Sequence, residues 1–170
     1  MFPPIQTLVN EYQDLHTFLS AQSEISHASA VDNHFRKVYL MSCASYYEKE
    51  ISEVIEKFVL PTDPRIANFV RHYALKDKFF VHFNLRSSSA NIKDFLSLFG
   101  PDFKSEINNQ IKQNNTLEQQ VFAFYEIMRL RNNMVHDNFL TYNLEKTFNE
   151  IHELNLKAIE FIAFLKNILK

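Results

Sequence analysis

Residues 31–59 read VDNHFRKVYLMSCASYYEKEISEVIEKFV and contain neither Gly nor Pro. Apolar and small residues recur along this segment at the three- and four-residue spacing of one helix face. The expected core-facing stripe is Val31, Phe35, Val38, Ser42, Ser45, Tyr46, Ile51, Val54, Ile55 and Phe58. Ser29 with Asp32 three residues later resembles a capping box, and Pro61 ends the segment. The sequence therefore predicts a long helix that starts at Ser29 and runs to Val59.

Prolines and capping residues divide the rest of the chain into shorter helical segments. Asp63-Pro64 is typical of a helix start, with Asp at the cap and Pro at the first helical position. Gly100 followed by Pro101 ends a short helix, and Thr116 with Gln119 forms a second expected capping box. The other expected helices are 3–19, 64–75, 91–99, 102–113, 116–135 and 144–170. We expect connections at 21–29 and 87–89, while 79–83 fits either a helix end or an extended segment.

The whole chain has 170 residues and a single Gly. Dinucleotide-binding turns, phosphate loops, nucleophile elbows and EF-hands all need Gly where the backbone curls or approaches a ligand closely. Tight hairpin turns need it as well, which disfavours an antiparallel sheet. A length near 150 residues suggests one domain. We therefore expect a single all-α domain over residues 1–170: an up-and-down bundle of four main helices, with a short helical insertion between the second and third.

Charge and cysteine content limit the classes of partner and the cellular compartment that we expect. Eighteen Lys and Arg against twenty Asp and Glu give a formal net charge of −2, so the basic field of a non-specific nucleic-acid binder is missing. Cys43 is the lone cysteine, which excludes an intramolecular disulfide and a multi-thiolate zinc site. No apolar run approaches the roughly 18 residues of a membrane span, and the N-terminus lacks a signal-peptide pattern. We expect a cytoplasmic protein without a membrane partner.

Metal and thiol chemistry lack their usual patterns. The H-E-x-x-H element of metal hydrolases does not occur in the sequence. His152 and Glu153, which follow Glu150, fit a solvated helix face better than a metal site. Cys43 lies within the long helix and fits the core better than a reactive thiolate, which needs a partly exposed, electropositive setting. The sequence thus predicts no metal and no other cofactor.

A group of polar residues lies at the end of the expected 116–135 helix. Arg131, Asn132 and His136 follow an apolar helical pattern and precede a polar break. An Arg can pair two non-bridging phosphate oxygens, and a His can exchange a proton near neutral pH. Five helical positions correspond to about 140° of rotation. Arg131 and His136 therefore converge only if the helix ends near Val135 or if two chains pool their motifs. The alternative is an ordinary surface Arg with a helix-terminal His.

This Arg-Asn-x-x-x-His pattern resembles the ribonuclease motif of the HEPN superfamily, named for higher-eukaryote and prokaryote nucleotide binding. Residues 91–100 are similar to an "N-I … F-G" segment of its prokaryotic branch called RiboL-PSP-HEPN or MAE_28990-type HEPN-like nucleases, and Tyr47-Glu48 matches a Tyr/Phe-Glu pair. The resemblance covers most of residues 20–165. Two positions depart from it: Asp137 stands where Gly is common, and Asn138 stands where one subgroup carries a Tyr.

The resemblance implies an endoribonuclease whose catalytic residues are Arg131, Asn132 and His136. Without a metal site, cleavage uses an internal nucleophile, the RNA 2′-hydroxyl, and leaves a 2′,3′-cyclic phosphate and a 5′-hydroxyl. The resemblance also implies a homodimer with a composite site, in which Arg129 contributes to binding of the RNA substrate. Glu48 fits either a polar partner of Arg131 or a surface residue of its helix.

By the same resemblance, the biological role is that of a toxin or a phage-defence effector, with an antitoxin or another protein as partner. Two other interpretations stay open. One is a catalytically silent HEPN module that dimerises or binds a partner protein. The other is a helical-bundle interaction protein in which the spacing of Arg131 and His136 is accidental. A measurement of RNA cleavage separates the enzyme from both.

Overall fold

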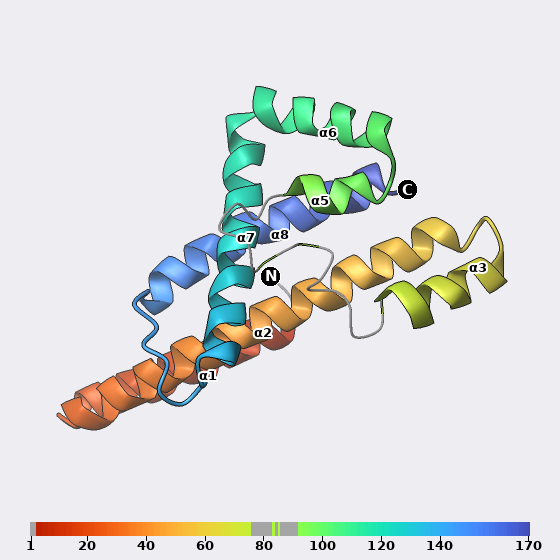
Figure 1. Ribbon diagram of the computed structural model, residues 1–170. Helices are drawn as coiled ribbons and strands as arrows, with labels where there is room; N and C mark the ends of the chain where they lie inside the picture. Colours follow the sequence, from red (N-terminus) through yellow and green to blue (C-terminus); the bar gives the residue numbers. More distant parts are fainter. Residues whose placement is uncertain (1–2, 76–82, 84, 86–91) are drawn as a thin grey trace.

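A computed structural model describes residues 3–75, 83, 85 and 92–170 (Figure 1). Within these residues every regular element is helical, which confirms the all-α prediction. The elements are α1 (Pro3–Ala21), α2 (Ile25–Val59), α3 (Pro64–Phe69), the π-helical segment η1 (Val70–Leu75), α5 (Ile92–Ser97), α6 (Pro101–Gln113), α7 (Asn115–His136) and α8 (Phe148–Ile168). The expected loop at 87–89 and residues 79–82 of the ambiguous stretch lie outside the described residues.

Four long helices form the body of the protein. α1 packs along α2, and α8 packs against both α7 and α2. The shorter elements α3, η1, α5 and α6 lie between α2 and α7 in the chain. In Figure 1, α7 runs steeply across α2 and α8 rather than alongside them. The up-and-down arrangement of the four main helices is therefore not confirmed. The crossing places the C-terminal end of α7 against α2, beside the loop that leads to α8.

The start of α2 differs from the prediction. A turn joins α1 to α2, in which Ser23 has a φ of 60° and the Glu24 amide donates to the Leu19 carbonyl at 3.0 Å. The helix begins immediately after this turn, at Ile25, and Ser29 lies inside it. The predicted capping box was wrong because the turn already reverses the chain, so the Ser- and Ala-rich residues that follow it are free to continue the helix.

The buried face of α2 is broader than the predicted stripe. Ile51 and Val54 are buried as expected. By contrast, Val38, Ser45 and Phe58 of the predicted stripe are exposed. The middle of the helix instead buries a different set: Tyr39, Leu40, Cys43, Ala44 and Tyr47. Because α2 contacts α1, α7 and α8, apolar residues on several sides are covered, and a single stripe does not describe them.

The start of α7 lies one residue before the predicted capping box. The side chain of Asn114 accepts a hydrogen bond from the Leu117 amide at 3.1 Å and caps the helix. Thr116, the predicted cap, lies inside the first turn. Asn is preferred over Thr at the N-cap position, which explains why the earlier residue takes this role.

The start of α8 lies later than the predicted residue 144. Thr147 and Glu150 form a reciprocal capping box at the true start. The Glu150 amide donates to Thr147 Oγ1 at 3.3 Å, and the Thr147 amide donates to Glu150 Oε2 at 2.8 Å. The hydrogen bond from the Thr147 amide holds the pKa of the Glu150 carboxyl below its usual value. The residues before Thr147 belong to the loop between α7 and α8.

One predicted helix start is confirmed, and one predicted helix end lies elsewhere. The Asp63 side chain accepts a hydrogen bond from the Arg65 amide at 2.7 Å, with Pro64 at the first position of α3. Gly100 has a φ of 100°, a conformation that L side chains rarely adopt. The short helix α5 nevertheless ends at Ser97, and Gly100 with Pro101 opens α6, one residue before its predicted start. Both boundaries depend on residue types whose backbone preferences leave few alternatives.

Polar side chains join α2 to α8 inside the core. The Tyr47 hydroxyl donates to Asn155 Oδ1 at 2.7 Å, and Asn155 Nδ2 donates to the Tyr39 hydroxyl oxygen at 3.1 Å. The same Tyr39 oxygen lies 2.9 Å from His152 Nδ1. His152 is therefore half-buried and bonded, which corrects the prediction of a solvated face at that residue. Burial raises the pKa of the Cys43 thiol to about 12, and its place in the core confirms the prediction.

Candidate functional site

The predicted motif lies at the C-terminal end of α7, which stays helical through His136. Arg131 is half-buried, Asn132 has 9% of its surface exposed, and His136 is exposed. Because α7 ends only at His136 and stays helical through that residue, Arg131 and His136 remain about 140° apart around the helix axis. A single chain therefore does not bring these two side chains onto one face of α7.

Arg131 is directed toward α2, where Glu48 is its charged neighbour. Burial lowers the pKa of the Arg131 guanidinium below its usual value, and the Glu48 carboxylate opposes that shift. Glu48 is itself half-buried. An arginine side chain stays protonated in proteins. The structure thus brings together two of the predicted residues and presents a permanent cation that is partly withdrawn from water.

Asn132 and His136 lie one helical turn apart and share a face of α7. The side chain of Asn132 is nearly fully buried, while the imidazole of His136 reaches solvent at the last residue of the helix. The two side chains therefore lie in different surroundings. Asn132 faces the protein interior, whereas the imidazole of His136 is accessible from solvent.

Arg129 lies on the side of α7 away from Arg131, because two residues correspond to about 200° of helix rotation. Its guanidinium donates to the two carboxylate oxygens of Glu126, each at 3.0 Å. Lys146 lies 3.7 Å from the same carboxylate. These side chains line a pocket of about 290 Å³ together with Leu130, Tyr142, Asn143 and Glu145. Arg129 is thus paired within the chain, and one chain does not combine it with Arg131 in a common cleft.

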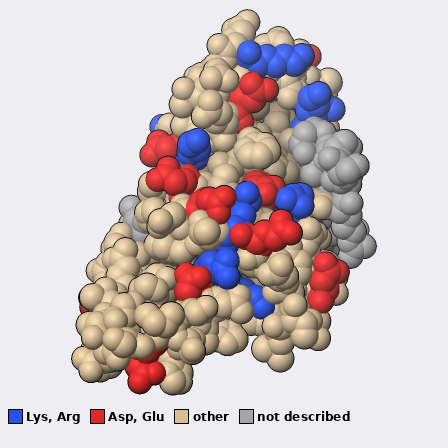
Figure 2. Space-filling view, turned by 90° about the vertical axis from the view of Figure 1, so that its left-hand side faces the viewer, with Lys and Arg blue, Asp and Glu red and all other residues tan. Residues whose placement is uncertain are grey.

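Charges of both signs alternate on the face shown in Figure 2. Lys and Arg side chains lie between Asp and Glu side chains near its centre, and the coloured part of this face shows no broad region of one sign. The mixture agrees with the formal net charge of −2. Electrostatic attraction for a polyanion on this face is therefore local rather than general.

α7 ends in a tight turn at Asp137 and Asn138, the two positions that depart from the pattern noted in the sequence. The Asp137 amide donates to the Asn133 carbonyl at 2.9 Å, and the next residue, Asn138, has a φ of 75°. The side-chain oxygen of Asn138 accepts a hydrogen bond from the Leu140 amide at 3.1 Å. The backbone carbonyl of Asn138 accepts another from the Tyr142 amide at 2.9 Å. Asn tolerates the left-handed conformation better than most residues. The positive φ of this turn therefore falls on Asn138, while Asp137 has a φ of −94°.

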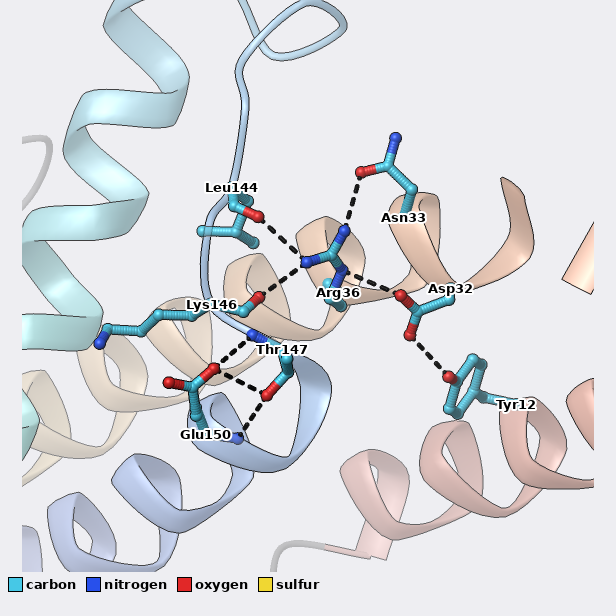
Figure 3. Close-up of polar contacts among 8 residues, drawn as sticks. All are labelled: Tyr12, Asp32, Asn33, Arg36, Leu144, Lys146, Thr147 and Glu150. Carbon is cyan, nitrogen blue, oxygen red and sulfur yellow. Dashed lines mark hydrogen bonds and ion pairs between the residues drawn. The ribbon is translucent and has the colours of Figure 1, made fainter. Parts of the chain in front are cut away.

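Two adjacent cations of α2 hold the loop that follows this turn. The Lys37 ammonium donates to the Phe139 and Leu140 carbonyls, both at 3.1 Å. The Arg36 guanidinium donates to two further carbonyls at the other end of the loop, at 3.1 and 3.0 Å (Figure 3). The sequence carries no signal for either role, since the acceptors are backbone carbonyls that every residue possesses.

Within residues 3–75, 83, 85 and 92–170, no three His, Cys, Asp or Glu side chains lie together as a metal-ligand set. No helix in that part of the chain is both long and apolar enough to cross a bilayer.

Among the comparisons with known proteins, a family model matches this chain. Neither the curated proteins nor the solved structures contained a match. The family model described as RiboL-PSP-HEPN matches residues 6–170. The matched region begins within α1, includes every later helix, and contains Arg131, Asn132 and His136.

Proposed function

Because the chain belongs to the RiboL-PSP-HEPN family, we propose that it is a metal-independent endoribonuclease that uses Arg131 and His136. HEPN-type domains are generally associated with ribonuclease activity. The observation that carries the proposal is the end of α7, where an exposed His136 follows an Arg131 held beside Glu48. A proton-transfer group and a fixed cation are what phosphodiester cleavage requires from side chains.

In the proposed reaction the RNA 2′-hydroxyl oxygen attacks the adjacent phosphorus. An imidazole takes the proton of the 2′-hydroxyl, the bond between phosphorus and the 5′-oxygen breaks, and an acid protonates that leaving oxygen. Arg131 pairs two non-bridging oxygens and stabilises the charge that develops on them. The buried Asn132 supports the turn of helix that ends in His136. The products are a 2′,3′-cyclic phosphate and a 5′-hydroxyl, so the substrate is RNA and not DNA.

The placement of the motif favours a homodimer, because one chain keeps Arg131 and His136 about 140° apart on α7, while the reaction needs both at one phosphate. We infer that two copies place their α7 ends on either side of one cleft, where His136 of one copy acts with Arg131 of the other. Exposed apolar side chains next to the motif in the chain suit such a contact: Val135 before His136, and Leu140 after it with 76% of its surface exposed. Their burial between copies would be favourable.

A mixture of two inactive variants tests the composite site. Arg131→Ala and His136→Ala each lack half of the motif, but a heterodimer of the two retains Arg131 on one copy and His136 on the other. About half of the dimers in an equal mixture are heterodimers after subunit exchange. We therefore expect the initial rate of RNA cleavage to rise well above that of either variant taken through the same exchange alone. A mixture that is no faster than its components would rule out the composite site.

The activity itself is tested by incubating the purified chain with RNA in EDTA and identifying the fragment ends. We expect fragments that carry a 2′,3′-cyclic phosphate and a 5′-hydroxyl. Intact RNA would favour the second candidate function, a catalytically silent HEPN module that binds a partner protein. The pairing of Arg129 with Glu126 supports that candidate, because it takes up a cation that RNA could otherwise use.

The proposed biological role is that of a toxin or a phage-defence effector acting on RNA in the cytoplasm, under the control of an antitoxin or another partner protein. This role rests on the family and its ribonuclease association. Growth arrest on expression of the wild type, and its absence with His136→Ala, would support it. Normal growth with the folded wild-type protein, expressed without a partner, would oppose it.

A further inference from the structure

We propose that Arg36 and Lys37 are positioning residues for His136. This dipeptide of α2 fixes both ends of the α7–α8 loop, residues 137–147, and the loop in turn fixes the end of α7. The catalytic consequence rests on the proposed function, whereas the anchoring rests on the contacts alone. The proposal does not require Arg36 or Lys37 to contact RNA.

Lys37 holds the beginning of the α7–α8 loop. Only 2% of its surface is exposed, and its ammonium donates to the Phe139 and Leu140 carbonyls at 3.1 Å each. The same ammonium lies 5.9 Å from the centroid of the Phe139 ring, within the range of a cation–π contact. Phe139 follows His136 by three residues. The contacts of Lys37 therefore fix the backbone three and four residues beyond His136.

Arg36 holds the end of the loop (Figure 3). Its Nη1 donates to the Leu144 carbonyl at 3.1 Å and to the Lys146 carbonyl at 3.0 Å. Asp32, one turn earlier, lies 3.2 Å from Arg36 Nε and accepts a hydrogen bond from the Tyr12 hydroxyl at 2.8 Å. Burial and Asp32 raise the pKa of Tyr12 to about 12, so this hydroxyl remains a donor at neutral pH. The guanidinium is thus oriented by α2 and tied to α1.

The use of cations at these two places points to positioning rather than to packing. Burying an ammonium costs free energy that two carbonyl acceptors return only in part. An apolar side chain of the same length would fill the same space without that cost. The carbonyls also lie just beyond the C-terminal end of α7, where the helix dipole favours a cation. Two neighbouring residues of α2 thus hold the loop backbone at two points. A catalytic side chain needs rigid support of this kind.

Lys37→Met tests the beginning of this anchor, because Met keeps the apolar length of the side chain and removes its donors. The matched control is Lys57→Met, at the far end of α2, where the lysine side chain is 77% exposed. We measure amide hydrogen exchange in residues 137–147, the NMR signals of the His136 ring, and kcat and KM for RNA. For Lys37→Met we expect faster exchange in the loop, shifted ring signals, and a kcat lower by about 10²-fold with KM little changed. Lys37→Arg, which restores donors, should recover part of kcat.

Three outcomes would overturn the inference: loop exchange equal to that of the wild type, exchange that rises equally in α1 and α8, or an unchanged kcat despite a freed loop. The second outcome would show a general loss of structure. If the wild type itself leaves RNA intact, the proposed function fails. Loop exchange and the His136 ring signals then still decide the anchoring, since both are measured without substrate.

Discussion

Replacing His136 with alanine is expected to lower kcat for RNA cleavage by about 10²–10⁴-fold, the range that general acid–base catalysis contributes. The imidazole is exposed at the last residue of α7. Its removal therefore takes away few packing contacts, and we expect a thermal unfolding midpoint close to that of the wild type. The measurement is the single-turnover rate on a labelled RNA, with the unfolding midpoint recorded on the same preparation.

His27→Ala is the matched control for this substitution. His27 is an exposed histidine at the start of α2, paired with Glu24 at 3.0 Å and remote in sequence from the motif. We expect this variant to cleave RNA at the wild-type rate. A His136→Ala variant that keeps the wild-type rate would remove His136 from the mechanism. An equal loss in both variants would attribute the effect to histidine content or to folding rather than to the motif.

Replacing Arg131 with alanine is expected to lower kcat by about 10²–10³-fold, the cost of removing one electrostatic donor from a developing oxyanion. Arg131→Lys keeps the charge but loses the planar fork that pairs two phosphate oxygens. We therefore expect Arg131→Lys to retain only part of the activity. Because Arg131 is half-buried near Glu48, we also expect Arg131→Ala to reduce the free energy of unfolding.

A double variant separates the catalytic from the structural effect of Arg131. Arg131→Ala leaves the Glu48 carboxylate without the cation beside it, and Glu48→Gln removes the charge of that carboxylate. We expect the double variant to be more stable to urea than Arg131→Ala and to be as inactive. Recovery of cleavage in the double variant would show that Arg131 acts through the fold and not on the phosphate.

The fold was predictable where one residue type has one strong local consequence. Asp63 before Pro64 caps a helix, and Gly100 adopts a positive φ before Pro101, as the sequence indicates. Ser29 was misplaced because several residues in its neighbourhood can start a helix, and the turn at Ser23 takes that role first. The middle of α2 was misjudged for a related reason. Contacts with several other helices decide which of its sides are buried, and that information is not local.

The candidate site was predictable only as far as local spacing and a family pattern reach. Glu48 was named from such a pattern, and the structure brings it near Arg131. Arg129 is predicted to join Arg131 in a cleft between two copies; within one chain its guanidinium pairs with Glu126 on another side of α7. Arg36 escaped prediction because it binds main-chain carbonyls, which leave no trace in the residue types of the loop.

The 2′-hydroxyl is the centre of the proposed mechanism, and its removal is the most direct test. The wild-type protein is incubated in EDTA with one RNA oligonucleotide, and with the same oligonucleotide carrying a single 2′-deoxy nucleotide at the position of cleavage. We predict cleavage of the first, with a 2′,3′-cyclic phosphate at the new end, and no cleavage of the second at that position. Cleavage that persists at the 2′-deoxy nucleotide, or that occurs only when a metal ion is restored, would contradict a mechanism based on Arg131, His136 and the 2′-hydroxyl.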